Sequence, residues 1–183
     1  MEVLIHFVFQ LFKIGLLSVF YVFVFVQLQK RFNKNKPKIK VGTFKIVGYY
    51  LIAYVLLFVY SFTYWGNHGL GDEPRIPIGH WKVVKNINWQ DSGYVDTKNG
   101  QLEMEKFLVK KGKLFGKYDN SFATNSHEFF ILDLDSEELL EFESEQAYNL
   151  YVNDKDFPDS SELLNYHTNY MNRWGGIRFF LLP

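Results

Sequence analysis

The chain has 183 residues, no cysteine, and equal numbers of basic and acidic side chains. This length leaves room for one small domain besides any membrane segments, and the lack of cysteine excludes disulfides, thiolate nucleophiles and Cys-ligated zinc. The zero net charge is a cancellation, because residues 1–66 hold eight Lys or Arg and one acid, whereas residues 67–183 hold 12 Lys or Arg and 19 acids. The acidic second part argues against a nucleic-acid partner, since phosphate binding depends on clustered Lys and Arg.

Two long apolar segments, residues 8–28 and 46–65, dominate the first part of the chain. About 20 apolar residues are enough for an α-helix to cross ~30 Å of hydrocarbon. Tyr50 near the start of the second segment and Trp65 at its end are typical of side chains at the two membrane interfaces. The pattern predicts a two-helix transmembrane hairpin over residues 1–66, with the lipid bilayer as a partner.

The loop between the two segments, residues 29–45, carries seven Lys or Arg and no acid. Loops with such a bias face the cytoplasm, so both termini are expected outside a bacterial-type inner or plasma membrane. Residues 67–183 then form an acidic extracytoplasmic domain. A cleaved signal peptide is the rival interpretation of the first segment, but no basic region precedes that segment and no small-residue cleavage site follows it.

The first apolar segment also carries polar residues at helical spacing. His6, Gln10 and Lys13 share one helix face, which Leu17 interrupts before Tyr21 rejoins it. Ionisable groups inside a membrane often mark an ion path or a polar seam between subunits. Because Lys13 lies near the outer end of the segment, its side chain can instead reach the headgroups, which favours helix packing or a homo-oligomer through the transmembrane helices.

The second part of the chain alternates apolar and polar residues between turn signals, which predicts an antiparallel sheet. The phase of the alternation flips at Gly79-His80, and a strand with a bulge explains such a flip. Hairpin turns are predicted at Lys111-Gly112 and across residues 135–138.

Two short helices are expected after the sheet. Ser144 is a candidate N-cap for a helix over residues 145–152, and Asp159 opens a capping-box pattern before a helix over residues 160–174. The second helix carries an apolar stripe formed by Leu163, Tyr166, Tyr170 and Trp174. Residues 177–182 are predicted to form a closing strand. Strands followed by helices indicate an α+β domain.

Metal and cofactor patterns are incomplete in this sequence. The run of acids that begins at Asp133 has the spacing of the first calcium ligands of an EF-hand, but it lacks the required glycine and the acid at the twelfth position. His127-Glu128 begins a zinc-protease pattern, and Ile131 stands where the second histidine is required. We therefore predict no metal and no cofactor.

One group of polar residues, Asp72, Arg75 and His80, is the candidate binding site. A titratable histidine beside a strand irregularity and near an arginine suits a site, although a histidine there is also commonly a structural hydrogen-bonding residue.

The leading prediction is a membrane-anchored extracytoplasmic binding or interaction module, immunity-like or accessory in role, whose acidic surface attracts another, basic protein. Two alternatives stay open. One is an extracytoplasmic hydrolase that uses His80 with a carboxylate, and the other is a membrane oligomer or pore that uses the polar stripe of the first segment.

Overall fold

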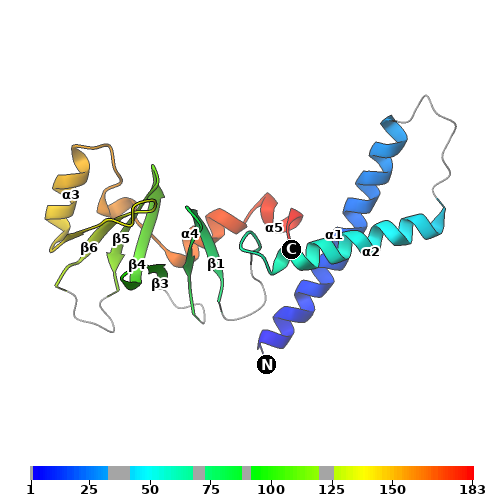
Figure 1. Cartoon of the computed structure of the whole chain (residues 1–183), viewed down its shortest axis with the longest axis horizontal. Coiled ribbons are helices and arrows are strands. Elements are labelled where there is room, and N and C mark those ends of the chain that lie inside the picture. The colour runs from blue at the N-terminus through cyan, green and yellow to red at the C-terminus, as the bar shows by residue number, and fades with distance from the viewer. Residues whose placement is uncertain (1, 33–41, 68–72, 88–91, 120–125) are drawn as a thin grey trace. The chain divides into compact units, whose positions relative to one another are not determined.

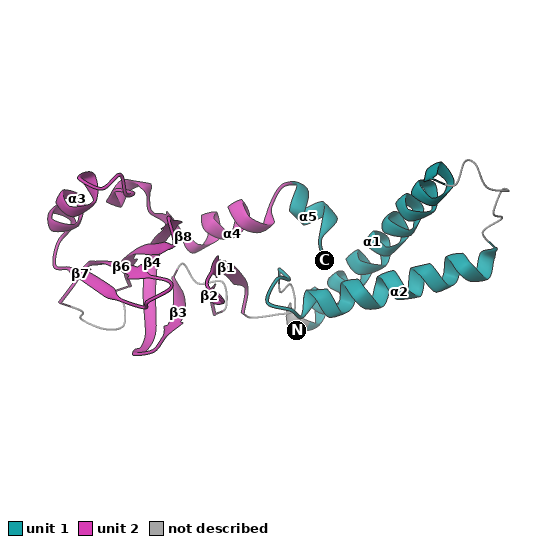
Figure 2. Cartoon of the chain, turned by 45° about the horizontal axis from the view of Figure 1, so that its top comes forward, with its two compact units in different colours: residues 1–71, 177–183 teal, residues 72–176 magenta. Residues whose placement is uncertain are grey.

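The structure is a computed structural model of the chain that describes residues 2–32, 42–67, 73–87, 92–119 and 126–183 (Figure 1). The chain divides into two compact units, Met1–Gly71 with Ile177–Pro183, and Asp72–Gly176 (Figure 2). The sequence predicted that the domain covers residues 67–183. In the structure, Ile177–Pro183 group with the helical unit and not with the domain.

The helical unit contains α1 (Glu2–Phe32) and α2 (Thr43–Ser61). These helices include most of the predicted apolar segments, and both are long and apolar enough to cross a membrane. The central part of the basic loop, residues 33–41, lies outside the described residues.

α1 and α2 pack against each other through aromatic side chains and a close approach at a glycine. The Phe25 and Tyr49 rings meet edge to face with centroids 5.2 Å apart. A Cβ atom on Gly15 would lie 3.6 Å from Oη of Tyr50, which is an ordinary van der Waals distance, so α2 lies directly beside this glycine. The helices thus contact each other along one side, while most of their apolar side chains remain exposed.

The second unit is built around an antiparallel sheet in which each of the first six strands pairs with the next along the chain. The strands are β1 (Arg75–Gly79), β2 (Lys82–Lys85), β3 (Gly93–Thr97), β4 (Gly100–Lys110), β5 (Lys113–Tyr118), β6 (Phe129–Asp133) and β7 (Leu139–Phe142). A short eighth strand, β8 (Leu164–Asn165), pairs with β4. The predicted α+β class is confirmed.

The hairpins at Lys111-Gly112 and between β6 and β7 are confirmed. The predicted bulged strand is in fact a hairpin, because His80 and Trp81 form the turn between β1 and β2 with φ of 49° and 60°. The pairing register is irregular within β1, as a bulge predicts, but the apolar phase flips because the chain reverses direction. Positive φ at both central residues is the geometry of a two-residue type I′ hairpin.

The first predicted helix is confirmed as α3 (Glu145–Asn153), whose N-cap Ser144 accepts a hydrogen bond from the backbone N–H of Ala147 at 3.3 Å. This side chain satisfies one of the backbone donors that a helix leaves free at its N-terminus.

The second predicted helix is wrong as a continuous element. It is broken into η1 (Ser160–Glu162), β8 and α4 (Tyr166–Trp174). Asp159 caps η1 with the predicted capping box, but Leu163 is extended, and the next two residues pair with Lys106 and Phe107 of β4. Sheet hydrogen bonds thus replace helical ones at this point, and α4 starts anew.

The predicted closing strand is also wrong, because residues Ile177–Leu181 form the short helix α5. Gly175 ends α4 and Gly176 follows with φ of 61°, a conformation that favours glycine. The backbone N–H of Leu182 then donates to the carbonyl of Arg178 at 2.9 Å, which is a helical bond.

The sheet is buried on both faces at β5 and β6. On one face, Phe115, Phe129, Ile131 and Phe142 pack with Tyr148 and Val152 of α3. Leu114, Phe130 and Leu132 alternate with these residues along β5 and β6, so they point to the opposite face, where they are also buried. Glu137, in the turn between β6 and β7, forms an ion pair of 2.9 Å with Lys82 of β2. The sheet therefore curls so that strands distant in sequence enclose the second face.

Candidate functional site

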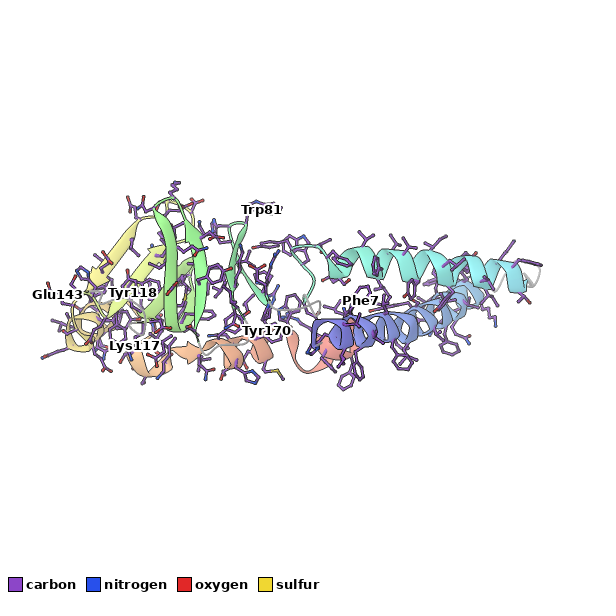
Figure 3. All side chains as sticks on the ribbon, turned by 90° about the horizontal axis from the view of Figure 1, so that it is seen from below. Phe7, Trp81, Lys117, Tyr118, Glu143 and Tyr170 are labelled. Atoms are coloured by element: carbon purple, nitrogen blue, oxygen red, sulfur yellow. The ribbon has the colours of Figure 1, made fainter. Side chains whose placement is uncertain are left out.

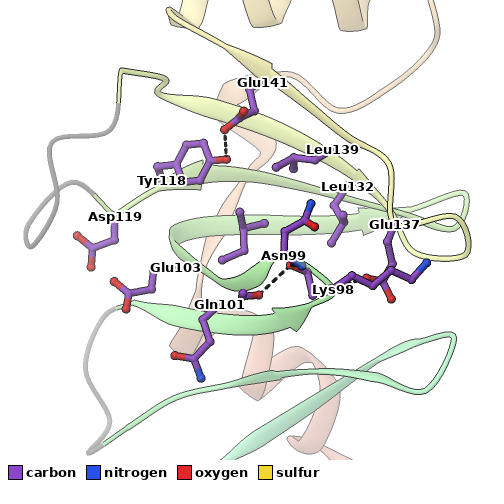
Figure 4. Close-up of a pocket in the computed structure, with 13 residues that line it drawn as sticks. Lys98, Asn99, Gln101, Glu103, Tyr118, Asp119, Leu132, Glu137, Leu139 and Glu141 are labelled. Carbon is purple, nitrogen blue, oxygen red and sulfur yellow. Dashed lines mark hydrogen bonds between the residues drawn. The ribbon is translucent and has the colours of Figure 1, made fainter.

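The curled sheet leaves a cleft of about 550 Å³ at the start of β4, beside the β3–β4 turn and the ends of β5 and β7 (Figure 4). This volume lies within the range of small-ligand sites, ~300–1,000 Å³. Three leucines, Leu102, Leu132 and Leu139, contribute apolar surface to its lining. Leu102 and Leu132 are buried, and Leu139 is 38% exposed.

The charged residues that line the cleft are mostly acidic. They include the carboxylates of Glu103, Asp119, Glu137 and Glu141 and the amine of one lysine, Lys98. Because these groups come from β4, the residue after β5, the β6–β7 turn, β7 and the β3–β4 turn, only the folded sheet gathers them. The cleft therefore combines apolar surface with an excess of negative charge.

Tyr118 and Glu141 form a hydrogen-bonded pair in the wall of the cleft. The Tyr118 hydroxyl donates to a Glu141 oxygen at 2.5 Å (Figure 4). Burial and the Glu141 carboxylate raise the pKa of Tyr118 above its usual range, because both disfavour a phenolate. Tyr118 is thus a hydrogen-bond donor at neutral pH, and it orients the carboxylate of Glu141.

Glu137 holds the rim of the cleft together. Its carboxylate accepts hydrogen bonds from the Lys82 amine at 2.9 Å and from the backbone N–H of Lys98 at 2.7 Å. These two donors lower the pKa of Glu137, so the side chain is ionised at neutral pH. Glu137 therefore connects β2, the β3–β4 turn and the β6–β7 turn, and its role is structural.

Glu103 differs from Glu137 because it is exposed. Its carboxylate has no hydrogen-bond or ion-pair partner within the part of the chain that the structure describes. Figure 4 shows Glu103 beside Asp119 on one side of the cleft. Glu103 is therefore a carboxylate of the cleft that is open to a ligand.

Among the described residues near the cleft, Ser126, His127 and Glu141 do not form a nucleophilic relay. Ser126 Oγ lies 3.2 Å from His127 Nδ1, and a Glu141 oxygen lies 3.8 Å from the same nitrogen. A serine triad needs the nucleophile on one ring nitrogen and the acid on the other. Among the described residues there is also no group of three or more His, Asp or Glu placed to hold a metal ion.

Arg75 and His80, predicted to share a site, are not brought together. Arg75 begins β1 and pairs with Glu73 at 2.6 Å, whereas His80 follows the last residue of β1 and lies 3.3 Å from Asp135. A strand advances about 3.3 Å per residue, so the two side chains start roughly 15 Å apart. Asp72, the third predicted member, lies outside the described residues.

The His80–Asp135 pair is the arrangement nearest to the predicted hydrolase site. Its side chains are 43% and 86% exposed, and neither residue lines the cleft. An exposed His–Asp contact between two turns, outside the lining of the cleft, gives the hydrolase hypothesis no further support.

The predicted polar stripe, His6, Gln10, Lys13 and Tyr21, lies entirely on α1. Gln10 is buried, and its Nε2 atom has no partner among the described residues. The Lys13 amine lies 4.5 Å from the centre of the Phe179 ring, and the Tyr21 hydroxyl donates to the carbonyl of Leu181 at 2.5 Å. Two members of the stripe therefore contact the last residues of the chain, and no lumen is needed to explain them.

Sequence reasoning missed the cleft, although Glu141 lies in a strand of the predicted second hairpin, and it predicted no strand at Glu103, which the structure places in β4. The signal was weak because an acidic residue on the outer face of a strand is common. Comparison with known protein families, with curated proteins and with solved structures found no match to this chain.

Proposed function

We propose that the chain is a membrane-anchored binding module whose acidic cleft recognises a basic segment of another protein, as an immunity-like or accessory protein does. The observation that carries this proposal is the combination of leucine side chains and carboxylates in one cleft. A Lys or Arg side chain has the complementary structure, since its aliphatic stem packs on apolar surface while its charged end meets carboxylates.

The unpartnered carboxylate of Glu103 supports binding rather than a structural role for the cleft. A buried or paired carboxylate already has its hydrogen-bond or ion-pair partners within the protein. An exposed carboxylate without such a partner can pair with a cation of a ligand. Around it the acidic domain attracts basic partners over longer distances, which accelerates association at low salt.

The exposure of the two long helices supports the membrane anchor. In the most apolar part of α2, 0% of the residues are buried, and in that of α1 the share is 22%. A helix in the core of a soluble domain buries its apolar face against protein. Helices this apolar and this open fit a lipid environment, and the basic loop between them favours a cytoplasmic loop and an extracytoplasmic domain.

Binding is tested with a defined cationic probe. Pentalysine is titrated into the full chain in lipid nanodiscs by calorimetry, with pentaglutamate as the probe of opposite charge. We expect pentalysine to bind more weakly as salt rises, and Glu103→Gln to weaken it by about twofold to fivefold, the effect of losing one exposed charge pair. Glu143→Gln removes an exposed acid that does not line the cleft (Figure 3) and is expected to leave binding unchanged.

Two results would overturn the cleft as the binding site. One is equal weakening by Glu103→Gln and Glu143→Gln, which indicates attraction to the acidic surface as a whole. The other is the absence of pentalysine binding at low salt.

The orientation is tested by labelling a single cysteine in a chain that has none of its own. Lys155 is exposed in the second unit, so Lys155→Cys is treated with a membrane-impermeant thiol reagent in intact cells. Labelling is expected because the domain faces outward. Protection that disappears on lysis would place the domain in the cytoplasm.

A further inference from the structure

We propose that residues 177–183 form a third membrane-contacting element, which packs on α1 with one side and faces lipid with the other. This inference rests on the proposed membrane insertion of α1. It adds a second membrane contact, after the C-terminal boundary of the domain. The observations that carry it are the composition of this segment, its contacts with α1 and the satisfaction of its backbone.

The segment is apolar and open. Its only charged residue is Arg178. The exposed fractions of its large apolar side chains are 76% for Ile177, 54% for Phe179, 72% for Phe180 and 38% for Leu181. Contiguous exposed apolar side chains are unusual on a soluble surface, whereas a short helix of this composition suits the boundary between headgroups and acyl chains.

Two contacts place the segment along α1. The Lys13 amine lies 4.5 Å from the centre of the Phe179 ring, within the range of a cation–π interaction. The Tyr21 hydroxyl donates to the carbonyl of Leu181 at 2.5 Å. Lys13 and Tyr21 are eight residues apart, about 12 Å along α1, so the side chains of two separate turns of α1 reach the segment.

The backbone of the segment is suited to a dry environment. The last carbonyls of a helix lack helical partners, and an unpaired carbonyl is costly in hydrocarbon. Tyr21 supplies the donor that Leu181 needs. Pro183 has no N–H to satisfy and is buried, whereas α5 exposes its apolar side chains. One side of the segment is therefore packed on protein, and the other is left for lipid.

This arrangement attaches the domain to the membrane through the chain segments at both its N-terminal and its C-terminal boundary. The second unit runs from Asp72 to Gly176, and the chain on either side of it belongs to the helical unit. A domain with two attachments has fewer orientations at the surface than a domain on one linker, and less entropy is then lost when its cleft meets a partner.

Lipid contact is measured with a fluorophore on single cysteines. Phe180→Cys, Phe20→Cys and Leu150→Cys are labelled with a nitrobenzoxadiazole probe, and the full chain is placed in phosphatidylcholine and phosphatidylglycerol vesicles that contain nitroxide-labelled lipids. Phe20 is 48% exposed on α1 and reports the proposed span, whereas Leu150 is 73% exposed on α3 and reports the domain. We expect quenching at position 180 to lie within twofold of that at position 20 and to exceed that at position 150 at least threefold.

The outcomes separate this inference from the proposed function. If position 20 is quenched and position 180 resembles position 150, the third element is overturned and the membrane anchor stands. If position 20 is not quenched either, the membrane anchor fails, and this inference fails with it.

The packing on α1 has its own test. Tyr21→Phe removes the hydroxyl that donates to Leu181 and keeps the ring, so quenching at position 180 is expected to fall at least twofold. Tyr54→Phe makes the same chemical change on α2 and is expected to have no effect. Equal quenching in both variants would show that the segment does not depend on this contact with α1.

Discussion

α2 and β6 are both built largely from apolar residues, but they bury opposite kinds of side chain. In α2, which is described throughout, the buried residue is Ser61, while Leu51 and Leu56 are 56% and 64% exposed. In β6 all four apolar residues, from Phe129 to Leu132, are buried, because α3 covers one face and the curled sheet covers the other.

This difference teaches that apolar content does not by itself decide burial. In a sheet domain surrounded by water, apolar side chains must be covered by protein. Lipid removes that requirement, and only backbone groups and polar side chains then need partners. Ser61 fits this view, since its hydroxyl donates to the carbonyl of Phe58 at 2.7 Å.

The largest expected effect sharpens this comparison inside the domain. Phe130 is fully buried, and a Cβ atom on Gly116 would overlap its ring. We expect Phe130→Ala to destabilise the domain by about 3–5 kcal/mol, through lost burial and a cavity. Phe9→Ala on α1 removes a ring that is 68% exposed and is expected to leave domain unfolding unchanged. Denaturant titration followed by near-UV circular dichroism measures both, and comparable losses would contradict the comparison.

A charge on α2 is expected to have the next largest effect. Leu56→Lys places an ammonium on a helix proposed to lie in hydrocarbon, which costs about 2.5–3.5 kcal/mol near the centre of a span. Leu150→Lys makes the same change on α3, where the leucine is 73% exposed. Alkaline carbonate extraction of membranes should release more of the first variant and none of the second. Equal retention of the two variants in the membrane fraction would contradict the proposal that α2 lies in lipid and α3 in water.

A smaller effect is expected at the turn between β1 and β2. Trp81 has φ of 60°, is 81% exposed and projects from the domain (Figure 3). Because a side chain disfavours this left-handed conformation, Trp81→Gly is expected to stabilise the domain by about 1 kcal/mol relative to Trp81→Ala. The alanine variant loses the same ring but keeps the Cβ atom, so it is the matched control. Urea unfolding of the two variants gives the difference, and a value near zero would mean that the turn carries no strain.

The smallest expected effect concerns pH. The folded pKa of Glu137 is lowered by Lys82 and by the backbone N–H of Lys98. Its contribution to stability is therefore complete above the usual glutamate pKa of about 4.3 and is lost as the pH falls below that value. Glu137→Gln is expected to destabilise the domain at pH 7 and to flatten its loss of stability between about pH 5 and 3.

Glu138→Gln is the control for this pH experiment, because Glu138 is the exposed neighbour in the same turn. The slope should flatten only in part, since Asp133 and Asp96 also have lowered pKa values from their lysine partners. An unchanged slope in Glu137→Gln would show that this ion pair does not stabilise the folded sheet.

Much of the fold was predictable because its signals are local. Lys111-Gly112 forms its hairpin, Ser144 caps α3, and Asp159 builds its capping box, each through residues only a few positions apart. The apolar residues of the two long helices likewise lie in continuous runs. Such features depend on backbone preferences and nearest neighbours, which a sequence displays directly.

The candidate site was less predictable for the same reason. Arg75 and His80 are close in sequence, but an extended strand separates them, whereas Glu103 and Glu141 are far apart in sequence and line one cleft. A strand carries neighbours apart, and a curled sheet brings distant strands together.

The sequence by itself determined two apolar helices with a basic loop, an acidic α+β domain and the positions of its main turns and caps. Only the tertiary structure decided that β8 interrupts the last predicted helix, that the end of the chain is a helix grouped with α1, and that a leucine-lined acidic cleft opens in the sheet. The reason is the range of the forces involved. Helix caps and apolar periodicity act over a few residues, whereas strand pairing and sheet curling depend on contacts between segments whose approach the linear order does not specify.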